Sequence, residues 1–383
     1  MHEIRNFFQL DPTVTFLNHG SFGATPKPVL EAYQEWQFRL ERQPVLFLGR
    51  ELDGLLKASR QALGEYLKAE ADDLVYIPNA THGVNIISHS LNLHPGDEIL
   101  TTDHEYGACN YSWDFACMKT GAKYIHQPIK LPIQTEKEIM EQFWLGVTSR
   151  TKVIFVSHIT SPTAMRMPVE KICQRARQDG ILTIIDAAHS PGQIPIDMQG
   201  MGADFVFGNC HKWMVSPKGA AFLFARREIQ HLVEPLIVSW GFQAKPEAST
   251  GSRFLDLLQW TGTKDPAAAL TVPTAIQFMN DNNWNQVRHE CHLLLRQAIE
   301  RICELTGLPP LYPLESDFYS QMGIAPLPPS DIVNLKIRMY DEYKIEIPLI
   351  QWQDKQFLRI SIQGYNTQDD VDILVAALKE LLP

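Results

Sequence analysis

Two short apolar segments separated by a helical pattern constrain the fold of this chain more than any other feature. The segments Val153–Ser157 and Ile181–Ile185 are largely apolar without alternation, which is typical of strands buried on both faces of a parallel sheet. Between them, Pro168–Gly180 places apolar residues such as Val169 and Ile172 on one face of a helix. Strand, helix and strand in this order predict an α/β fold whose mostly parallel sheet is covered by helices.

The same alternation extends to about residue 270, and a different pattern follows. Further strands of the sheet are expected at Leu74–Ile77, Glu98–Thr101, Phe205–Phe207 and Ala220–Phe224. Beyond that point, helices are expected at Trp284–Leu305, Ser330–Tyr343 and Gln368–Leu381, and strands at Phe318–Ile324, Ile345–Pro348 and Phe357–Ile362. We therefore predict an N-terminal segment (residues 1–20), a large domain (21–268) and a smaller C-terminal α+β domain (269–383).

Charge and composition exclude several classes of protein. Hydrophobic residues form 45% of the 383 residues, which excludes a disordered chain. The 34 basic and 44 acidic residues give a net charge of −10, so we expect no nucleic-acid partner. The sequence has no uninterrupted apolar stretch of about 18 residues, so we expect no membrane span. Sparse cysteines without a CxxC pair, and no signal-peptide pattern at Met1–Leu10, predict a cytoplasmic protein with reduced thiols.

Two ionisable side chains follow predicted strands in the large domain. Asp186 comes directly after Ile181–Ile185, at the strand end where open α/β sheets bind ligands. A carboxylate there is partly desolvated and favours a cationic partner, although a helix cap or a turn residue is an alternative. Lys212 follows Phe205–Phe207 and precedes an apolar stretch, which lowers the pKa of a lysine and permits a Schiff base. A surface lysine is the alternative for Lys212 taken alone.

A third feature lies directly after the predicted strand Leu74–Ile77. Residues 78–85 include Thr81 and other small residues, and such a turn at the start of a helix can bind phosphate. An ordinary threonine helix cap is the alternative. Taken together with Asp186 and Lys212, the turn matches the needs of pyridoxal 5'-phosphate. Its phosphate requires the turn, its pyridinium nitrogen a carboxylate, and its aldehyde a lysine.

Several motifs between about Thr15 and the C-terminus carry a resemblance to a known family. They are Phe16–Gly23, Asn79–Thr81, Asp103–Ala108, Asp186–Pro191, His211–Trp213, Pro217–Gly219, Trp260–Asp265, Arg359–Ser361 and Tyr365–Thr367. With these motifs the chain resembles the class V aminotransferase family of fold-type I pyridoxal-phosphate enzymes, and within it the isopenicillin N epimerase-like branch. The resemblance implies a large domain with a mostly parallel seven-stranded sheet and a smaller C-terminal α+β domain.

The resemblance assigns the catalytic roles to three residues. No metal is expected, because the histidine pair at His289 and His292 is a weak ligand pattern. Lys212 would hold pyridoxal phosphate as an internal aldimine and move the α-proton of an amino-acid substrate. The reaction would then pass through a quinonoid intermediate. Asp186 would pair with the pyridinium nitrogen, which makes the ring an electron sink. His189 would lie near the phenolic oxygen of the ring.

The resemblance assigns further residues to the cofactor. Ala188 would pack on one face of the ring and Tyr106 would stack on the other, with His104 as the alternative to Tyr106. Thr263 would reach the phosphate bound by the neighbouring subunit, so a homodimer is the expected catalytic unit. The phosphate of the same subunit would be held by Ala80, Thr81, Asn209 and His211.

The substrate-binding residues implied by the resemblance come from both ends of the chain. Arg359 would bind the α-carboxylate of the substrate, ideally through two parallel hydrogen bonds. Without the resemblance, a lone arginine on a strand is interpreted as part of a surface ion pair. Asn18, His19 and Gly20 would line the substrate entrance, and a tight turn after an N-terminal strand is the alternative interpretation for them.

Two departures from the family pattern bear on the reaction. Residues 340–357, which precede Arg359, contain no cysteine, so a persulfide-forming desulfurase is not expected. Where many relatives carry a Ser-Asn pair, this chain has Thr160–Thr163, in which Ser161 is a weaker guide to substrate orientation. The sequence therefore does not identify the chemical group that the substrate carries beyond its α-carbon.

Epimerisation, C–S bond cleavage and transamination all begin with removal of the α-proton, so the cofactor residues do not separate them. The epimerase-like reaction is the first hypothesis, and a lyase acting on cysteine, cystine or a cysteine conjugate is the alternative. A second acid or base would discriminate them, and the candidates are His19, His82 and Tyr106. A non-catalytic scaffold is a further alternative, which the presence of both Lys212 and Asp186 disfavours.

Overall fold

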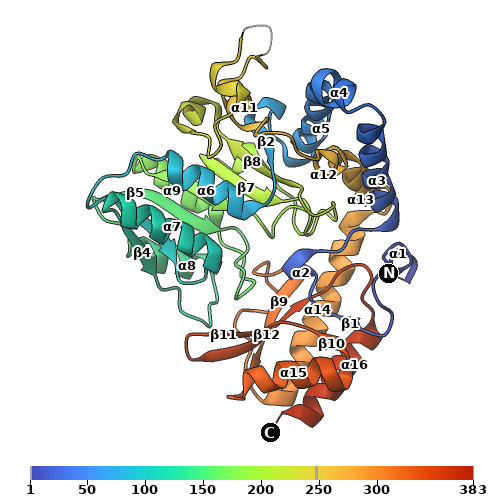
Figure 1. The fold of residues 1–383 in the computed structure, drawn as a ribbon. Helices are drawn as coiled ribbons and strands as arrows, with labels where there is room; N and C mark the ends of the chain where they lie inside the picture. The colour runs from blue at the N-terminus through green and yellow to red at the C-terminus, as the bar shows by residue number, and fades with distance from the viewer. Residues whose placement is uncertain (1, 246–248, 383) are drawn as a thin grey trace.

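A computed structural model describes residues 2–245 and 249–382, and its centre is a seven-stranded sheet with the order β2-β8-β7-β6-β5-β3-β4 (Figure 1). Its strands are β2 (Leu74–Ile77), β3 (Glu98–Thr102), β4 (Lys123–Gln127), β5 (Thr151–Ser157), β6 (Leu182–Asp186), β7 (Phe205–Asn209) and β8 (Ala221–Ala225). β8 runs antiparallel to both β2 and β7, and the remaining neighbours pair in parallel. The structure thus confirms the predicted mostly parallel sheet.

Both faces of this sheet are buried, as the apolar strand sequences require. In β5, Ile154 and Val156 pack in one hydrophobic cluster and Val153 and Phe155 pack in another, because successive side chains of a strand point to opposite faces. The helix α9 (Val169–Gln178) buries its apolar side in the first cluster. The helices α6 (Ala80–Ser90) and α7 (Gly107–Thr120) contribute to the second.

The C-terminal part of the chain forms a smaller three-stranded antiparallel sheet with the order β11-β12-β9. The elements of this C-terminal part are α14 (Trp284–Thr306), β9 (Met322–Leu327), α15 (Ile332–Tyr343), β10 (Ile345–Glu346), β11 (Leu349–Trp352), β12 (Lys355–Ser361) and α16 (Gln368–Leu381). Figure 1 shows these elements gathered below the large sheet, with β1 (Thr15–Phe16) among them because it pairs in parallel with β10. The division of the chain at residues 20 and 268 stays a prediction.

Further helices complete the part of the chain that the structure describes. They are α1 (His2–Arg5), α2 (His19–Phe22), α3 (Lys27–Arg42), α4 (Pro44–Leu46), η1 (Phe47–Glu51), α5 (Leu52–Leu67), η2 (Ala71–Asp73), α8 (Glu136–Trp144), α10 (Met198–Met201), η3 (Arg227–Leu232), η4 (Trp240–Gln243), α11 (Arg253–Leu258), α12 (Ala267–Leu270) and α13 (Val272–Asp281). Among the helices of residues 2–245 and 249–382, none is both long and apolar enough to cross a membrane.

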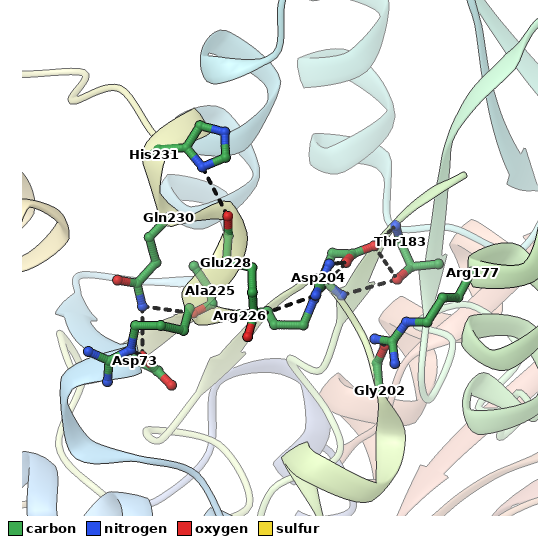
Figure 2. A network of polar contacts seen from close by, with 11 residues as sticks. Asp73, Arg177, Thr183, Gly202, Asp204, Ala225, Arg226, Glu228, Gln230 and His231 are labelled. Carbon is green, nitrogen blue, oxygen red and sulfur yellow. Dashed lines mark hydrogen bonds and ion pairs between the residues drawn. The ribbon is translucent and has the colours of Figure 1, made fainter. Parts of the chain in front are cut away.

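A buried carboxylate fixes the strand ends of the large sheet that lie away from Asp186 (Figure 2). Asp204, just before β7, accepts hydrogen bonds from the backbone N–H of Thr183 (2.8 Å) and from its hydroxyl (3.1 Å). The Arg226 guanidinium, just after β8, donates to the same carboxylate over 2.8 Å and 3.0 Å. Asp204 thereby joins three neighbouring strands, β6, β7 and β8.

We expect Asp204→Ala to lower the free energy of unfolding by about 2 kcal/mol, because a buried N–H loses its acceptor and Arg226 loses its partner. Urea denaturation measures the change. Glu228→Ala is the matched control, since Glu228 is largely exposed and contacts the same arginine (3.0 Å), and it should cost less than about 0.5 kcal/mol. Equal losses in the two variants would contradict this role of Asp204.

Candidate active site

A cavity of about 380 Å³ lies at the carboxyl ends of the parallel strands. β5, β6 and β7 end at this edge, where open α/β sheets bind their ligands. Nine of the residues that the sequence singled out line the cavity: Ala80, Thr81, Tyr106, Asp186, Ala188, His189, Asn209, His211 and Lys212. The strands thus bring together residues separated by more than a hundred positions.

Asp186, the last residue of β6, is a buried carboxylate that lines the cavity. Its Oδ1 accepts a hydrogen bond from the backbone N–H of Ala188 (2.7 Å), and its Oδ2 accepts a weak one from the Cys109 thiol (3.4 Å). Burial raises the pKa of Asp186, while the Ala188 hydrogen bond and the charge of Lys212 act in the opposite direction. A further cationic N–H in the cavity would therefore be stabilised here.

Lys212 is a buried amine in the same cavity. Its Nζ lies 3.3 Å from Nε2 of His189. Burial lowers the pKa of Lys212 from 10.5 to about 8, although the negative charge of Asp186 works against this shift. Burial also lowers the pKa of His189 far below its ordinary value, and the nearby Lys212 charge adds to this effect. This lower pKa increases the fraction of Lys212 that is a neutral, nucleophilic amine near neutral pH.

The N-terminus of α6 faces the cavity and offers a site for an anion. Asn79 caps the helix by accepting a hydrogen bond from the backbone N–H of His82 (2.9 Å), so the cap is Asn79 and not Thr81. The side chain of Asn209 accepts from the backbone N–H of Ala80 (2.9 Å) and ties β7 to the helix start. Thr81 lines the cavity in the first turn, where backbone N–H groups and the helix dipole favour phosphate.

Arg359 on β12 is a buried cation whose hydrogen-bond partners are neutral. Its Nη1 donates to the carbonyl oxygen (2.6 Å) and hydroxyl (3.1 Å) of Ser161, and its Nη2 donates to the Ser21 hydroxyl (3.2 Å). Its Nε is buried without a partner among the described residues. Burial lowers the pKa of Arg359 to about 10. Ser21 and Ser161 both line the cavity, so a carboxylate bound there would reach an uncompensated guanidinium.

The three residues predicted at the substrate entrance are buried and form structural contacts. Asn18 donates to the Glu346 carboxylate over 2.9 Å, and the backbone N–H of Gly20 donates to a serine hydroxyl on β12. His19 lies between the Lys212 carbonyl oxygen (3.1 Å) and the Tyr365 hydroxyl (3.0 Å). These contacts hold the segment whose next residues, Ser21 and Phe22, line the cavity.

The remaining predicted residues occupy different surroundings. Tyr106 lines the cavity and its side chain is 48% exposed. Its alternative, His104, is buried, with its ring nitrogens bonded to the Thr163 hydroxyl (2.7 Å) and the Ile129 carbonyl (2.8 Å). Thr263 is exposed on the loop between α11 and α12.

Sequence reasoning did not identify several residues that line the cavity. Ser157 ends β5 and carried the same signal as Asp186, namely a polar residue that closes an apolar strand. Phe22 belongs to the motif Phe16–Gly23, without a role assigned to it. Cys109 had no recognisable signal, because only the packing of α7 brings it to Asp186. Lys218 belongs to the noted Pro217–Gly219 motif, without a role assigned to it.

A buried lysine amine, a buried carboxylate and a helix N-terminus around one cavity fit the aldehyde, the pyridinium nitrogen and the phosphate of pyridoxal phosphate. An open, mostly parallel α/β sheet with these groups at its carboxyl edge defines the class of fold-type I pyridoxal-phosphate enzymes. The family model "Aminotransferase class-V" matches residues 16–320, so the chain belongs to the class V aminotransferase family.

Relatives within this family differ in their named reactions. The chain is 33% identical to an isopenicillin N epimerase of Amycolatopsis lactamdurans, over 98% of this chain and 97% of that protein. It is 27% identical to a probable chloroplastic L-cysteine desulfhydrase of Arabidopsis thaliana, over 98% and 84% of the two chains. A solved complex of the cystine C–S lyase C-DES with cysteine persulfide has the same fold, with a TM-score of 0.81, 20% identity and coverage of 97% and 99%.

Proposed function

We propose that this protein uses pyridoxal phosphate to remove the α-proton of an amino acid whose carboxylate is bound by Arg359. The observation that carries the proposal is the buried guanidinium with neutral partners, which contacts two serines on the wall of the Lys212 cavity. A buried cation without a carboxylate partner is costly unless a ligand supplies the negative charge. The α-carboxylate of an amino acid supplies this charge next to the reactive amine.

The chain's own residues have distinct tasks in this reaction. When bound, the cofactor supplies an electron-poor ring that accepts the electron pair of the α-carbon. Lys212 attaches the cofactor and, once displaced by the substrate amine, takes up the α-proton as a general base. Asp186 keeps the ring nitrogen protonated, which requires a carboxylate shielded from water. Arg359 orients the substrate so that its α-proton faces Lys212.

An epimerase-like outcome is the first candidate, and it needs an acid that returns the proton to the other face of the α-carbon. The contacts of the three residues proposed for this task support one of them. Tyr106 lines the cavity, whereas both ring nitrogens of His19 are bonded to Tyr365 and the Lys212 backbone. His82 is half-buried on α6 and follows the helix cap. Tyr106 is therefore the residue that we assign to this role.

A C–S lyase acting on cysteine or cystine is the second candidate, and the size of the cavity favours it. Its volume of about 380 Å³ is near the lower end of the range for ligand sites and must hold both cofactor and substrate. A short sulfur-containing amino acid fits this space better than a much larger substrate. Relatives named as cysteine desulfhydrases also match over most of this chain.

One experiment separates these outcomes. The protein, loaded with pyridoxal phosphate, is incubated in deuterated water with L-cysteine, L-cystine and a panel of other L-amino acids. Deuterium at the α-carbon with loss of optical rotation identifies an epimerase or racemase, and release of pyruvate with sulfide identifies a lyase. If no substrate exchanges its α-proton and no product forms, the proposed function is wrong.

We expect Arg359→Ala to raise KM for the amino acid that this screen identifies by about 10- to 100-fold, the effect of losing a charge-assisted hydrogen bond in a buried site. Steady-state kinetics measure the change, and cofactor content should stay close to that of the wild type. Arg338→Ala is the control, because Arg338 is exposed on α15 and pairs with Glu342. An unchanged KM would place the carboxylate site elsewhere.

The homodimer is also a proposal, and the position of Thr263 supports it. Thr263 is exposed, and the neighbouring Lys264 and Asp265 border a second cavity that shares Pro78 and Gly219 with the first. A second copy of the chain that covers this loop would bring its own Thr263 to the phosphate. Sedimentation of the full chain measures the association.

A further inference from the structure

Trp213, the residue that follows Lys212, makes a contact that determines where a neighbouring histidine carries its proton. The Trp213 side chain is fully buried, and its Nε1 lies 3.3 Å from Nδ1 of His189. An indole N–H donates hydrogen bonds and cannot accept them. Nδ1 of His189 is therefore the acceptor in this contact and carries no proton.

His189 is neutral because it is buried among basic groups. Burial lowers its pKa far below the ordinary value for histidine. Four groups that face it lower the pKa further, namely Lys212, Arg359, His19 and His211. A neutral imidazole carries one proton on one of its two nitrogens. Since Nδ1 accepts from Trp213, this proton is on Nε2.

The Nε2 proton is directed at the reactive lysine, because Nε2 of His189 lies 3.3 Å from Nζ of Lys212. A neutral amine accepts this hydrogen bond through its lone pair, whereas an ammonium group has only donors. The opposite tautomer of His189 would accept from an ammonium group and would favour the charged lysine. The observed arrangement therefore favours the uncharged amine, which is the form that attacks a carbonyl carbon or accepts a proton.

Packing limits the freedom of the Trp213 ring. The His19 ring lies over it, with ring centroids 4.9 Å apart, and His19 is itself held by Tyr365 and the Lys212 carbonyl. The Trp213 backbone is confined as well, because a Cβ atom at Gly192 would lie 2.2 Å from the Trp213 carbonyl oxygen. The indole N–H is thus held in position before any ligand binds.

We propose that Trp213 is a positioning residue that holds His189 as its Nε2–H tautomer and thereby favours the uncharged form of the Lys212 amine. The tautomer is a property of the protein alone. Its consequence for cofactor attachment rests on the function proposed above, so the two parts are measured separately.

The tautomer is measured by ¹⁵N NMR of the full-length, cofactor-free protein labelled at its histidine nitrogens, with His189→Gln identifying the signals. We expect the Nε2–H tautomer in the wild type. Trp213→Phe removes the donor and keeps an aromatic ring, so a signal from the Nδ1–H tautomer should appear. An Nδ1–H tautomer in the wild type overturns the proposal even if the variant does not fold, and so does an unchanged spectrum of a folded Trp213→Phe variant.

The effect on Lys212 is measured as the rate of covalent cofactor capture against pH. Trp213→Phe should slow capture about tenfold at pH 7 and move the midpoint of the profile to higher pH. The other charged or titratable groups that interact with Lys212 are the same in both proteins, namely Asp186, Arg359, Cys109, His19 and His211. Trp352→Phe is the control, since its buried indole donates to the Asp103 carbonyl (2.9 Å), and it should capture cofactor like the wild type.

The outcomes distinguish this proposal from the proposed function. If the expected tautomer is found but Trp213→Phe captures cofactor with the wild-type profile, the effect on Lys212 is wrong. If the wild type itself captures no cofactor, the proposed function is wrong, and the NMR result still decides the tautomer.

Discussion

Replacement of Lys212 by alanine is expected to abolish covalent attachment of pyridoxal phosphate and to reduce turnover by about four orders of magnitude. Attachment requires an amine that attacks the aldehyde carbon, with loss of water, and alanine offers no nitrogen. Burial lowers the pKa of Lys212 to about 8, so the wild-type protein has a reactive fraction at neutral pH. Borohydride reduction followed by peptide mass analysis should find the cofactor on Lys212 in the wild type and on no peptide in the variant.

Lys218→Ala is the matched control for this prediction. Lys218 lines the same cavity, but its Nζ donates to the Gly23 carbonyl (3.1 Å), and its loss should leave the label on Lys212. The rate of attachment should also rise with pH, with a midpoint near pH 8, because only the neutral amine reacts. A label that persists in Lys212→Ala, on Lys218 or elsewhere, would refute the assignment.

The part of this site that the sequence predicts well depends on one rule of sheet topology. Asp186 and Lys212 each follow a strand, and parallel strands bring their carboxyl ends to the same edge. The local strand patterns were therefore enough to predict that these two residues lie close together, and the structure has both strands, β6 and β7. The helix start at α6 was predicted for the same reason, although the capping residue is Asn79.

Contacts between distant segments could not be predicted in this way. The two serines bonded to Arg359 lie 198 and 338 residues away from it in the sequence, and no local pattern links them. The His19 ring likewise contacts the Lys212 carbonyl oxygen (3.1 Å), although 193 residues separate the two in the sequence.

Secondary structure shows the same division between local and long-range information. β2 and α16 have the predicted bounds. The strand expected at Phe318–Ile324 instead begins at Met322, since the preceding residues bond to the large domain through Gln193 and Arg166. β4 was missed because an edge strand with mixed polarity lacks the apolar signature of its buried neighbours.

Replacement of Asp186 by asparagine is expected to reduce turnover by about 10²- to 10³-fold while cofactor stays attached to Lys212. The oxygen of the introduced amide could still accept the backbone N–H of Ala188, which Asp186 Oδ1 accepts now over 2.7 Å, so the fold should be kept. The N–H₂ of that amide would be a donor where the protonated ring nitrogen needs an acceptor. The ring nitrogen would then lose its proton, and the ring would accept the α-carbon electron pair less well.

Kinetics and the α-deuterium exchange rate measure this loss, and Glu105→Gln serves as its control. Glu105 is the neighbouring buried carboxyl, but it is bonded to the Ser157 backbone N–H (2.9 Å) and the Thr102 hydroxyl (2.7 Å). Its replacement by the isosteric amide should change turnover only a few-fold, within about 1 kcal/mol. If Asp186→Asn retains near-normal exchange, or if Glu105→Gln lowers it equally, the carboxylate that controls the ring nitrogen is not Asp186. A loss confined to Asp186→Asn instead ties the rate to the one carboxylate that ends β6 inside the cavity.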